Sequence, residues 1–182
     1  MKLLLAWMAA AGWMLSVTEA QEHKELPKPG KEHMVLRQQF VGDWDAIATY
    51  EQGGKKEETK GTESVKSAFD GFWLVIDYKG EHQGKPYIGH GTLGYDPMKK
   101  KYLLTWIDNL APFAMWSDGD ADAAGKTFTF TSEGFCPDLG KTVKIRTVME
   151  VYDATHRSLT FYRPGKTGAE EKVGEIQYTR KS

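Results

Sequence analysis

Phe40-Val41-Gly42-Asp43-Trp44 begins the first strand-like segment of this chain, and Tyr178-Thr179-Arg180 ends the last one. In a closed antiparallel barrel the first and the last strand become neighbours. The guanidinium of Arg180 can then lie on the indole face of Trp44 and seal one end of the barrel through a cation–π contact. We therefore predict a barrel whose closure depends on Gly42, Trp44 and Arg180.

The sequence between these two stretches has the composition of short strands. Runs rich in Val, Ile, Thr, Tyr, Phe and Trp recur at hairpin spacing, and Gly, Asp and Lys turns separate them. No long helical pattern follows residue 42, so a parallel α/β fold is not expected. The predicted class is all-β, an antiparallel up-and-down barrel of about ten strands, although a two-sheet sandwich has the same period and stays open. The expected strands are 42–51, 58–68, 72–80, 86–95, 101–108, 113–121, 126–133, 142–153, 158–163 and 171–181.

The N-terminus has the features of an export signal. Lys2 provides the positive charge, residues 3–17 are uncharged and mostly apolar, and Thr18-Glu19-Ala20 brings a small residue to the cleavage point. The apolar run is too short to span a bilayer. We therefore expect cleavage after Ala20 and a secreted or periplasmic protein. The expected organisation is a signal peptide over 1–20, a flexible leader over 21–30 and one barrel domain over 31–182, with a short helix over 30–40 capping the closed end.

Charge and cysteine content narrow the choice of partners. The chain has 24 basic and 25 acidic residues, interspersed, and a formal net charge of −1. This balance gives no electrostatic reason to expect nucleic acid as a partner. The single cysteine, Cys136, excludes an intrachain disulfide, so the core alone must stabilise the domain. We expect a small-molecule ligand, no nucleic acid and no membrane span, while the oligomeric state is left open.

Strand alternation identifies candidate ligand contacts inside the barrel. If Trp44 points inward, Tyr50 shares its face, because side chains two residues apart lie on the same side of a strand. Trp106 and Asp108 also share one face and could orient the polar head of a ligand at the barrel mouth. The alternative is that Trp106 packs in the core and Asp108 begins the following turn.

Two more residues are candidates because of their chemistry. An inward Arg146 would anchor a carboxylate or phosphate, whereas an outward Arg146 makes an ordinary surface contact. The apolar residues on the opposite face of its strand favour the outward orientation. His90 lies in mid-strand, but one histidine without a spaced second ligand is a poor metal signal, so neither a metal nor a cofactor is expected. The candidate ligand-binding residues are Tyr50, His90, Trp106, Asp108 and Arg146, and no catalytic residue is assigned.

The segment Gly89-His90-Gly91-Thr92-Leu93-Gly94-Tyr95-Asp96, followed by Thr105-Trp106-Ile107-Asp108, resembles an uncharacterised bacterial family, number fifteen seventy-nine among the domains of unknown function. The resemblance also includes Val41-Gly42-Asp43-Trp44 and Tyr178-Thr179-Arg180, and it covers nearly the whole mature chain. It implies a secreted, lipocalin-like barrel of the calycin type, an architecture shared with the fatty-acid-binding proteins. It implies no established activity.

Together these features predict a secreted lipocalin-like protein that binds a small, partly apolar ligand in its barrel. Two alternatives stay open. One is a small-molecule enzyme that uses the same cavity with His90 or Asp108 as a base. The other is an envelope interaction module with a filled core and an exposed apolar patch. No motif positively indicates an enzyme, since the serines lack a glycine-flanked nucleophile elbow.

Overall fold

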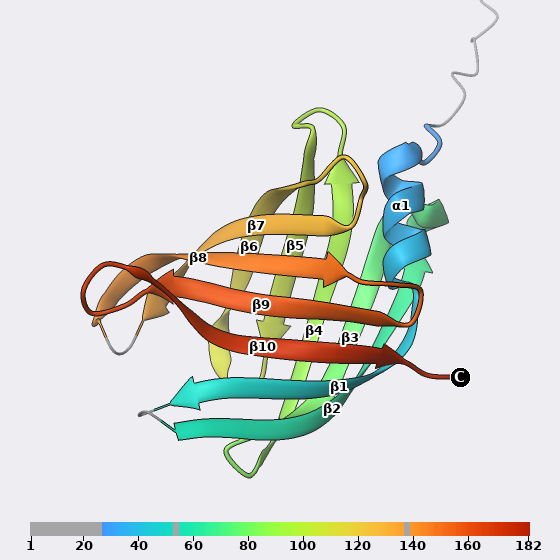
Figure 1. The fold of residues 1–182 in the computed structure, drawn as a ribbon. Coiled ribbons are helices and arrows are strands. Elements are labelled where there is room, and N and C mark those ends of the chain that lie inside the picture. The colour runs from blue at the N-terminus through green and yellow to red at the C-terminus, as the bar shows by residue number, and fades with distance from the viewer. Residues whose placement is uncertain (1–26, 53–54, 137–138) are drawn as a thin grey trace, which may run out of the picture.

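Ten strands follow one another around a closed antiparallel barrel, and the last strand pairs with the first (Figure 1). The computed structural model describes residues 27–52, 55–136 and 139–182. The expected signal peptide over 1–20 and most of the expected leader lie outside the described residues. Within the described part of the chain, no helix is long and apolar enough to cross a membrane.

The predicted up-and-down barrel is confirmed, because every strand pairs with its neighbours in the sequence and β1 also pairs with β10. This closure excludes the two-sheet sandwich. The observed strand ends differ from the predicted ones by at most three residues. The elements are α1 Lys31–Phe40, β1 Gly42–Gln52, β2 Lys55–Ala68, the short 3₁₀ turn η1 Phe69–Gly71, β3 Trp73–His82, β4 Lys85–Asp96, β5 Lys101–Asp108, β6 Ala111–Ala121, β7 Thr127–Cys136, β8 Lys141–Val151, β9 His156–Pro164 and β10 Glu170–Arg180.

Trp44 and Arg180 meet where β1 pairs with β10. The two residues are directly opposite in the register, and Cζ of Arg180 lies 4.1 Å from the centroid of the indole. The guanidinium also donates to the carbonyl oxygens of Val41 at 2.5 Å and Ala154 at 2.8 Å. Gly42 has φ of 143°, and a Cβ there would lie 2.2 Å from Nη1 of Arg180. Only glycine therefore leaves room for this guanidinium.

The helix α1 lies at the end of the barrel where β10 ends (Figure 1). Its buried residues His33, Leu36 and Phe40 recur at helical spacing, and the helix packs against β3, β4 and η1. At the helix start, the backbone N–H of Gly30 donates to Nδ1 of His33 at 3.1 Å. At its end, the carbonyl of Phe40 accepts a hydrogen bond from Nε1 of Trp44 at 3.0 Å. The helix is thus tied to the first strand at the closed end.

Candidate ligand-binding cavity

A cavity of about 340 Å³ occupies the barrel between its closed end and its open end. Its wall is mainly apolar because the inward-facing positions of most strands carry aliphatic side chains; these include Val65, Ile76, Leu93, Leu104, Met149 and Ile176. We call the polar groups near α1 the floor (Trp44, Glu63, Arg157 and Tyr178) and those near the opposite strand ends the mouth (Tyr50, Tyr87, Trp106, Asp108 and Arg163). Of these, all except Trp44 line the cavity directly.

A buried ion pair forms the floor. The side chains of Arg157 and Glu63 are 3% and 6% exposed, and Nη2 of Arg157 donates to Oε1 of Glu63. The two residues are on β9 and β2. These strands lie near each other only because β1 pairs with β10. Cζ of Arg157 lies 4.0 Å from the ring centroid of Tyr178 and 4.3 Å from that of Trp44. The guanidinium is therefore held by aromatic faces as well as by its counterion.

One N–H group of this guanidinium has no partner. Nε of Arg157 is buried and finds no hydrogen-bond acceptor among the described residues. Buried N–H groups are nearly always hydrogen-bonded in folded proteins, since leaving one unpaired costs about 1–3 kcal/mol. Arg157 lines the cavity with other atoms of its side chain, since Nε itself has almost no accessible surface.

The tyrosines around the floor are hydrogen-bond donors over an extended pH range. Burial, and next the charge of Glu63, raise the pKa of Tyr178 well above its ordinary value. Burial is also the main cause that raises the pKa of Tyr78, which is opposite Glu63 in the pairing of β2 with β3. Their hydroxyls therefore stay protonated at neutral pH and stand beside the buried carboxylate.

At the mouth, three side chains form a hydrogen-bonded chain. Nε1 of Trp106 donates to the hydroxyl of Tyr87 at 3.0 Å, and that hydroxyl donates to Oδ2 of Asp108 at 3.2 Å. Oδ1 of Asp108 accepts from the backbone N–H groups of Leu110 at 2.9 Å and Ala111 at 3.1 Å. Asp108 thus has two roles, since it lines the cavity and also begins the β5–β6 turn. Burial and the Asp108 charge raise the pKa of Tyr87.

Two glycines of β4 make room for the Trp106 ring. A Cβ at Gly89 would lie 2.1 Å from Cζ2 of Trp106, and one at Gly91 would lie 2.7 Å from its Cε3. Gly91 is directly opposite Trp106 in the pairing of β4 with β5. The Gly89-His90-Gly91 segment is therefore a flat surface on which the indole lies, with its N–H directed to Tyr87.

Three of the five predicted ligand contacts line the cavity, namely Tyr50, Trp106 and Asp108. The possible role of Arg146 as an anchor inside the barrel is corrected by its place on the outer face of β8. There its Nε and Nη2 donate to the two carboxylate oxygens of Glu170 at 2.9 and 2.6 Å. Its neighbours Ile145 and Thr147 face the cavity instead, as strand alternation requires.

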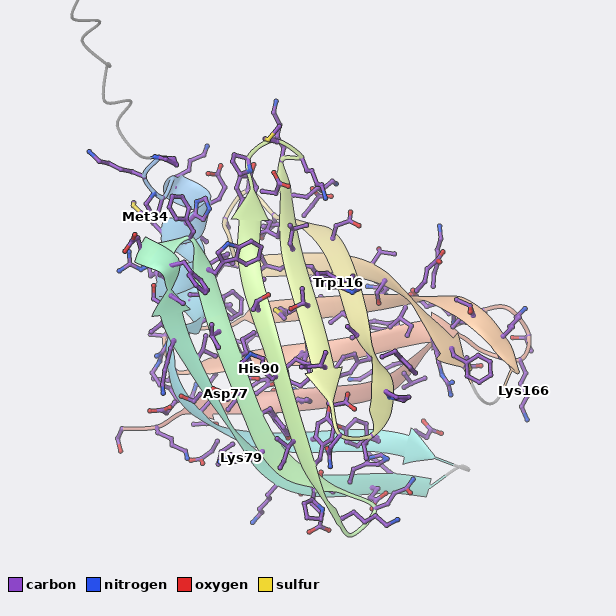
Figure 2. The ribbon with its side chains drawn as sticks, turned by 180° about the vertical axis from the view of Figure 1, so that it is seen from behind. Met34, Asp77, Lys79, His90, Trp116 and Lys166 are labelled. Atoms are coloured by element: carbon purple, nitrogen blue, oxygen red, sulfur yellow. The ribbon has the colours of Figure 1, made fainter. Side chains whose placement is uncertain are left out.

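His90 is also outside the barrel. Its Nδ1 lies 2.8 Å from Oδ1 of Asp77 on β3, and both side chains are about half exposed (Figure 2). The predicted role of His90 as a ligand contact or as a base in the cavity is therefore wrong, because its neighbours Gly89 and Gly91 occupy the inward positions. No group of three or more metal-ligating side chains occurs in the described parts of the chain.

Sequence reasoning missed the floor pair, Glu63 and Arg157. Each stands at an inward position, Glu63 two residues before the buried Val65 and Arg157 two residues before Leu159. The signal for such a pair is a charged residue at a position where strand alternation predicts an inward, apolar side chain. Arg157 lies just before the predicted strand 158–163, so strand alternation assigns it no face.

The profile of a family described as "Protein of unknown function (DUF1579)" matches residues 28–180, from before α1 to the last residue of β10. The chain belongs to the DUF1579 family. No curated protein matches this DUF1579 chain significantly.

Solved structures share the fold of this DUF1579 protein. Rv2717c from M. tuberculosis is 12% identical with a TM-score of 0.62, and the match covers 84% of this chain and 99% of that one. The S-type phycobiliprotein lyase CPES from Guillardia theta is 12% identical with a TM-score of 0.52, and the match covers 85% and 99%. At this identity the likeness concerns the fold of the DUF1579 chain and not its ligand.

Proposed function

We propose that this protein binds a small, partly apolar ligand inside its barrel. The observation that carries the proposal is the cavity of about 340 Å³, which has an aliphatic wall and hydrogen-bonding groups at both ends. This combination of apolar area and a few placed polar groups is typical of small-molecule sites. Tyr50, Trp106 and Asp108 would contact the ligand at the mouth, and Arg157 would contact it at the floor.

An interaction module with a filled core is supported less well. Single large apolar side chains are exposed, since Ile107, Phe113 and Trp116 are all more than half exposed, with Trp116 at 72% on the outside of β6 (Figure 2). A filled core, however, would leave no lumen, and the barrel has one. These exposed side chains therefore do not replace the cavity as the basis for a function.

We also propose that the protein is exported and cleaved after Ala20. The proposal is supported by Lys2, the apolar residues 3–17 and the small residue before the cleavage point. The intact mass of the protein recovered from the periplasm or medium tests it. A chain that starts at Gln21 is expected, and a full-length chain recovered from the cytoplasm would contradict it.

Native mass spectrometry tests ligand binding directly. The protein is isolated from the compartment in which it accumulates, and its native mass is compared with its mass after denaturation. A bound small molecule is expected to appear as an added mass that denaturation releases. Titration with the uncharged fluorescent probe N-phenylnaphthylamine is the parallel measurement, and the absence of binding in both experiments would contradict the proposal.

A cavity-filling variant assigns the binding to the barrel interior. Leu159 lines the cavity and is only half-buried, so Leu159→Trp is expected to occupy the lumen and to weaken probe binding at least about tenfold. Ile107→Trp places the same ring on the outer face, where Ile107 is exposed, and serves as the matched control. Equal affinities of the two variants would place the probe outside the barrel.

A further inference from the structure

We infer that Glu63 determines the charge selectivity of the cavity, so that the site takes an uncharged ligand and excludes carboxylates. The inference rests on the proposed function and specifies its ligand class. Without Glu63, Arg157 would be an obvious anchor for an anion.

The floor is already electrically neutral. Glu63 is in direct contact with Nη2 of Arg157, and both side chains are more than nine-tenths buried. A carboxylate brought to the floor would place a second negative charge beside Glu63 with only one cation between them. Repulsion between two like charges is strong where water is excluded. The floor therefore opposes an anionic head group although it contains an arginine.

The charges of all the side chains that line the cavity also cancel. Its lining contains four charged side chains, Glu63, Asp108, Arg157 and Arg163, two of each sign. Arg163 at the mouth donates to Sγ of Cys136 at 2.5 Å. No excess positive charge therefore faces the lumen, whereas a site for anions needs one.

An uncharged ligand avoids this repulsion. The Trp44 and Tyr178 rings lie against the Arg157 guanidinium in cation–π geometry, and its Nε has almost no accessible surface. An ester, ketone or ether adds no charge to the floor, and its alkyl chain would lie along the aliphatic wall.

A pair of probes with the same alkyl chain tests the inference. Methyl decanoate carries an uncharged carbonyl, and decanoate carries a carboxylate. Each is titrated against the wild-type protein carrying N-phenylnaphthylamine, and displacement gives the affinity. Methyl decanoate is expected to bind at least about tenfold more tightly than decanoate. Decanoate binding equally or more tightly would overturn the inference and leave cavity binding intact, whereas no binding of either probe would overturn both.

Glu63→Gln tests the residue itself. The amide keeps a hydrogen-bond acceptor for Arg157 but removes the negative charge, so the floor gains one net positive charge. Decanoate affinity is expected to rise about tenfold, while that of methyl decanoate changes little. Glu58→Gln, on the same strand but exposed, removes the same charge outside the cavity and is the matched control.

Each outcome of the variants decides the inference. Unchanged selectivity in folded Glu63→Gln, or an equal gain in Glu58→Gln, would overturn the role of Glu63. If Glu63→Gln fails to fold, the wild-type comparison of the two probes decides the charge selectivity alone.

Discussion

The guanidinium of Arg157 lies 4.3 Å from the centroid of the Trp44 indole, and the guanidinium of Arg180 lies 4.1 Å from the same centroid. One tryptophan thus contacts both the arginine that closes the barrel and the arginine at the floor of the cavity. The arrangement follows from register, since Trp44 is opposite Arg180 on β10 and opposite Glu63 on β2. Closure of the barrel and construction of the site therefore depend on the same side chain.

Replacement of Trp44 tests this dependence. Trp44 is fully buried, so Trp44→Ala is expected to lower the free energy of unfolding by about 3–5 kcal/mol, measured by urea titration. Trp116→Ala removes an indole that is 72% exposed and is expected to change stability by less than about 0.5 kcal/mol. A loss below about 1 kcal/mol in Trp44→Ala would show that the indole does not hold the two ends of the sheet together.

Loss of the floor ion pair is also expected to lower the free energy of unfolding. Glu63→Ala leaves the Arg157 charge buried without its counterion, and the free energy of unfolding is expected to fall by about 3–5 kcal/mol. Asp120→Ala breaks the exposed pair of Asp120 with Lys101, whose Nζ–Oδ2 distance is 2.5 Å, and is expected to cost less than about 1 kcal/mol. Similar losses in the two variants would contradict the desolvated character of the floor pair.

The barrel and half of the site were predictable from local patterns. Gly42, Trp44 and Arg180 indicated closure because their contacts depend only on the order of strands in a meander. Alternation placed Tyr50 and Trp106 on inward faces because the period of a strand is two residues. These inferences needed no knowledge of which distant strands face each other across the lumen.

The rest of the site depends on such long-range contacts. Glu63 and Arg157 are separated by 94 residues, and only the closed barrel brings them together as a pair. Arg146 shows the converse, because its chemistry made it a candidate although the apolar residues beside it already indicated an outward position. His90 was a candidate because it is a histidine in mid-strand, but the inward positions beside it are taken by glycines that support Trp106.

Alkaline pH is expected to destabilise the protein through its buried tyrosines. Burial raises the pKa values of Tyr78, Tyr87 and Tyr178 in the folded state, while an unfolded tyrosine has a pKa of about 10. Below pH ~10 both states bind the proton, and the stabilisation is fully present. Above that pH only the unfolded state loses protons, so the free energy of unfolding falls by up to about 1.4 kcal/mol per pH unit for each such tyrosine.

Urea titrations between neutral pH and pH ~11 measure this loss. Tyr87→Phe removes one of the three groups and is expected to make the alkaline decline shallower. Tyr152→Phe, at an exposed position on the surface, is the matched control for the loss of a tyrosine hydroxyl. A decline of the same slope in all three proteins would refute a contribution from Tyr87.

A methyl group on the glycine surface of β4 under Trp106 is expected to destabilise the protein. A Cβ at Gly91 would lie 2.5 Å from the backbone oxygen of Thr105 and 2.7 Å from Cε3 of Trp106, neither of which is the free end of a flexible side chain. Gly91→Ala is therefore expected to lower the free energy of unfolding by about 1–3 kcal/mol. It should also tilt the indole away from Tyr87 and weaken N-phenylnaphthylamine binding in the cavity.

Gly134→Ala is the matched control for this change. A Cβ at Gly134 would lie 2.7 Å from Cδ1 of Ile145, the end of a flexible side chain that can move aside. Its cost in stability is expected to be below that of Gly91→Ala in the same urea titration. The positions differ in what the new methyl group meets and not in the substitution itself. Equal costs, or unchanged probe affinity in Gly91→Ala, would therefore show that Trp106 does not depend on the glycine surface of β4.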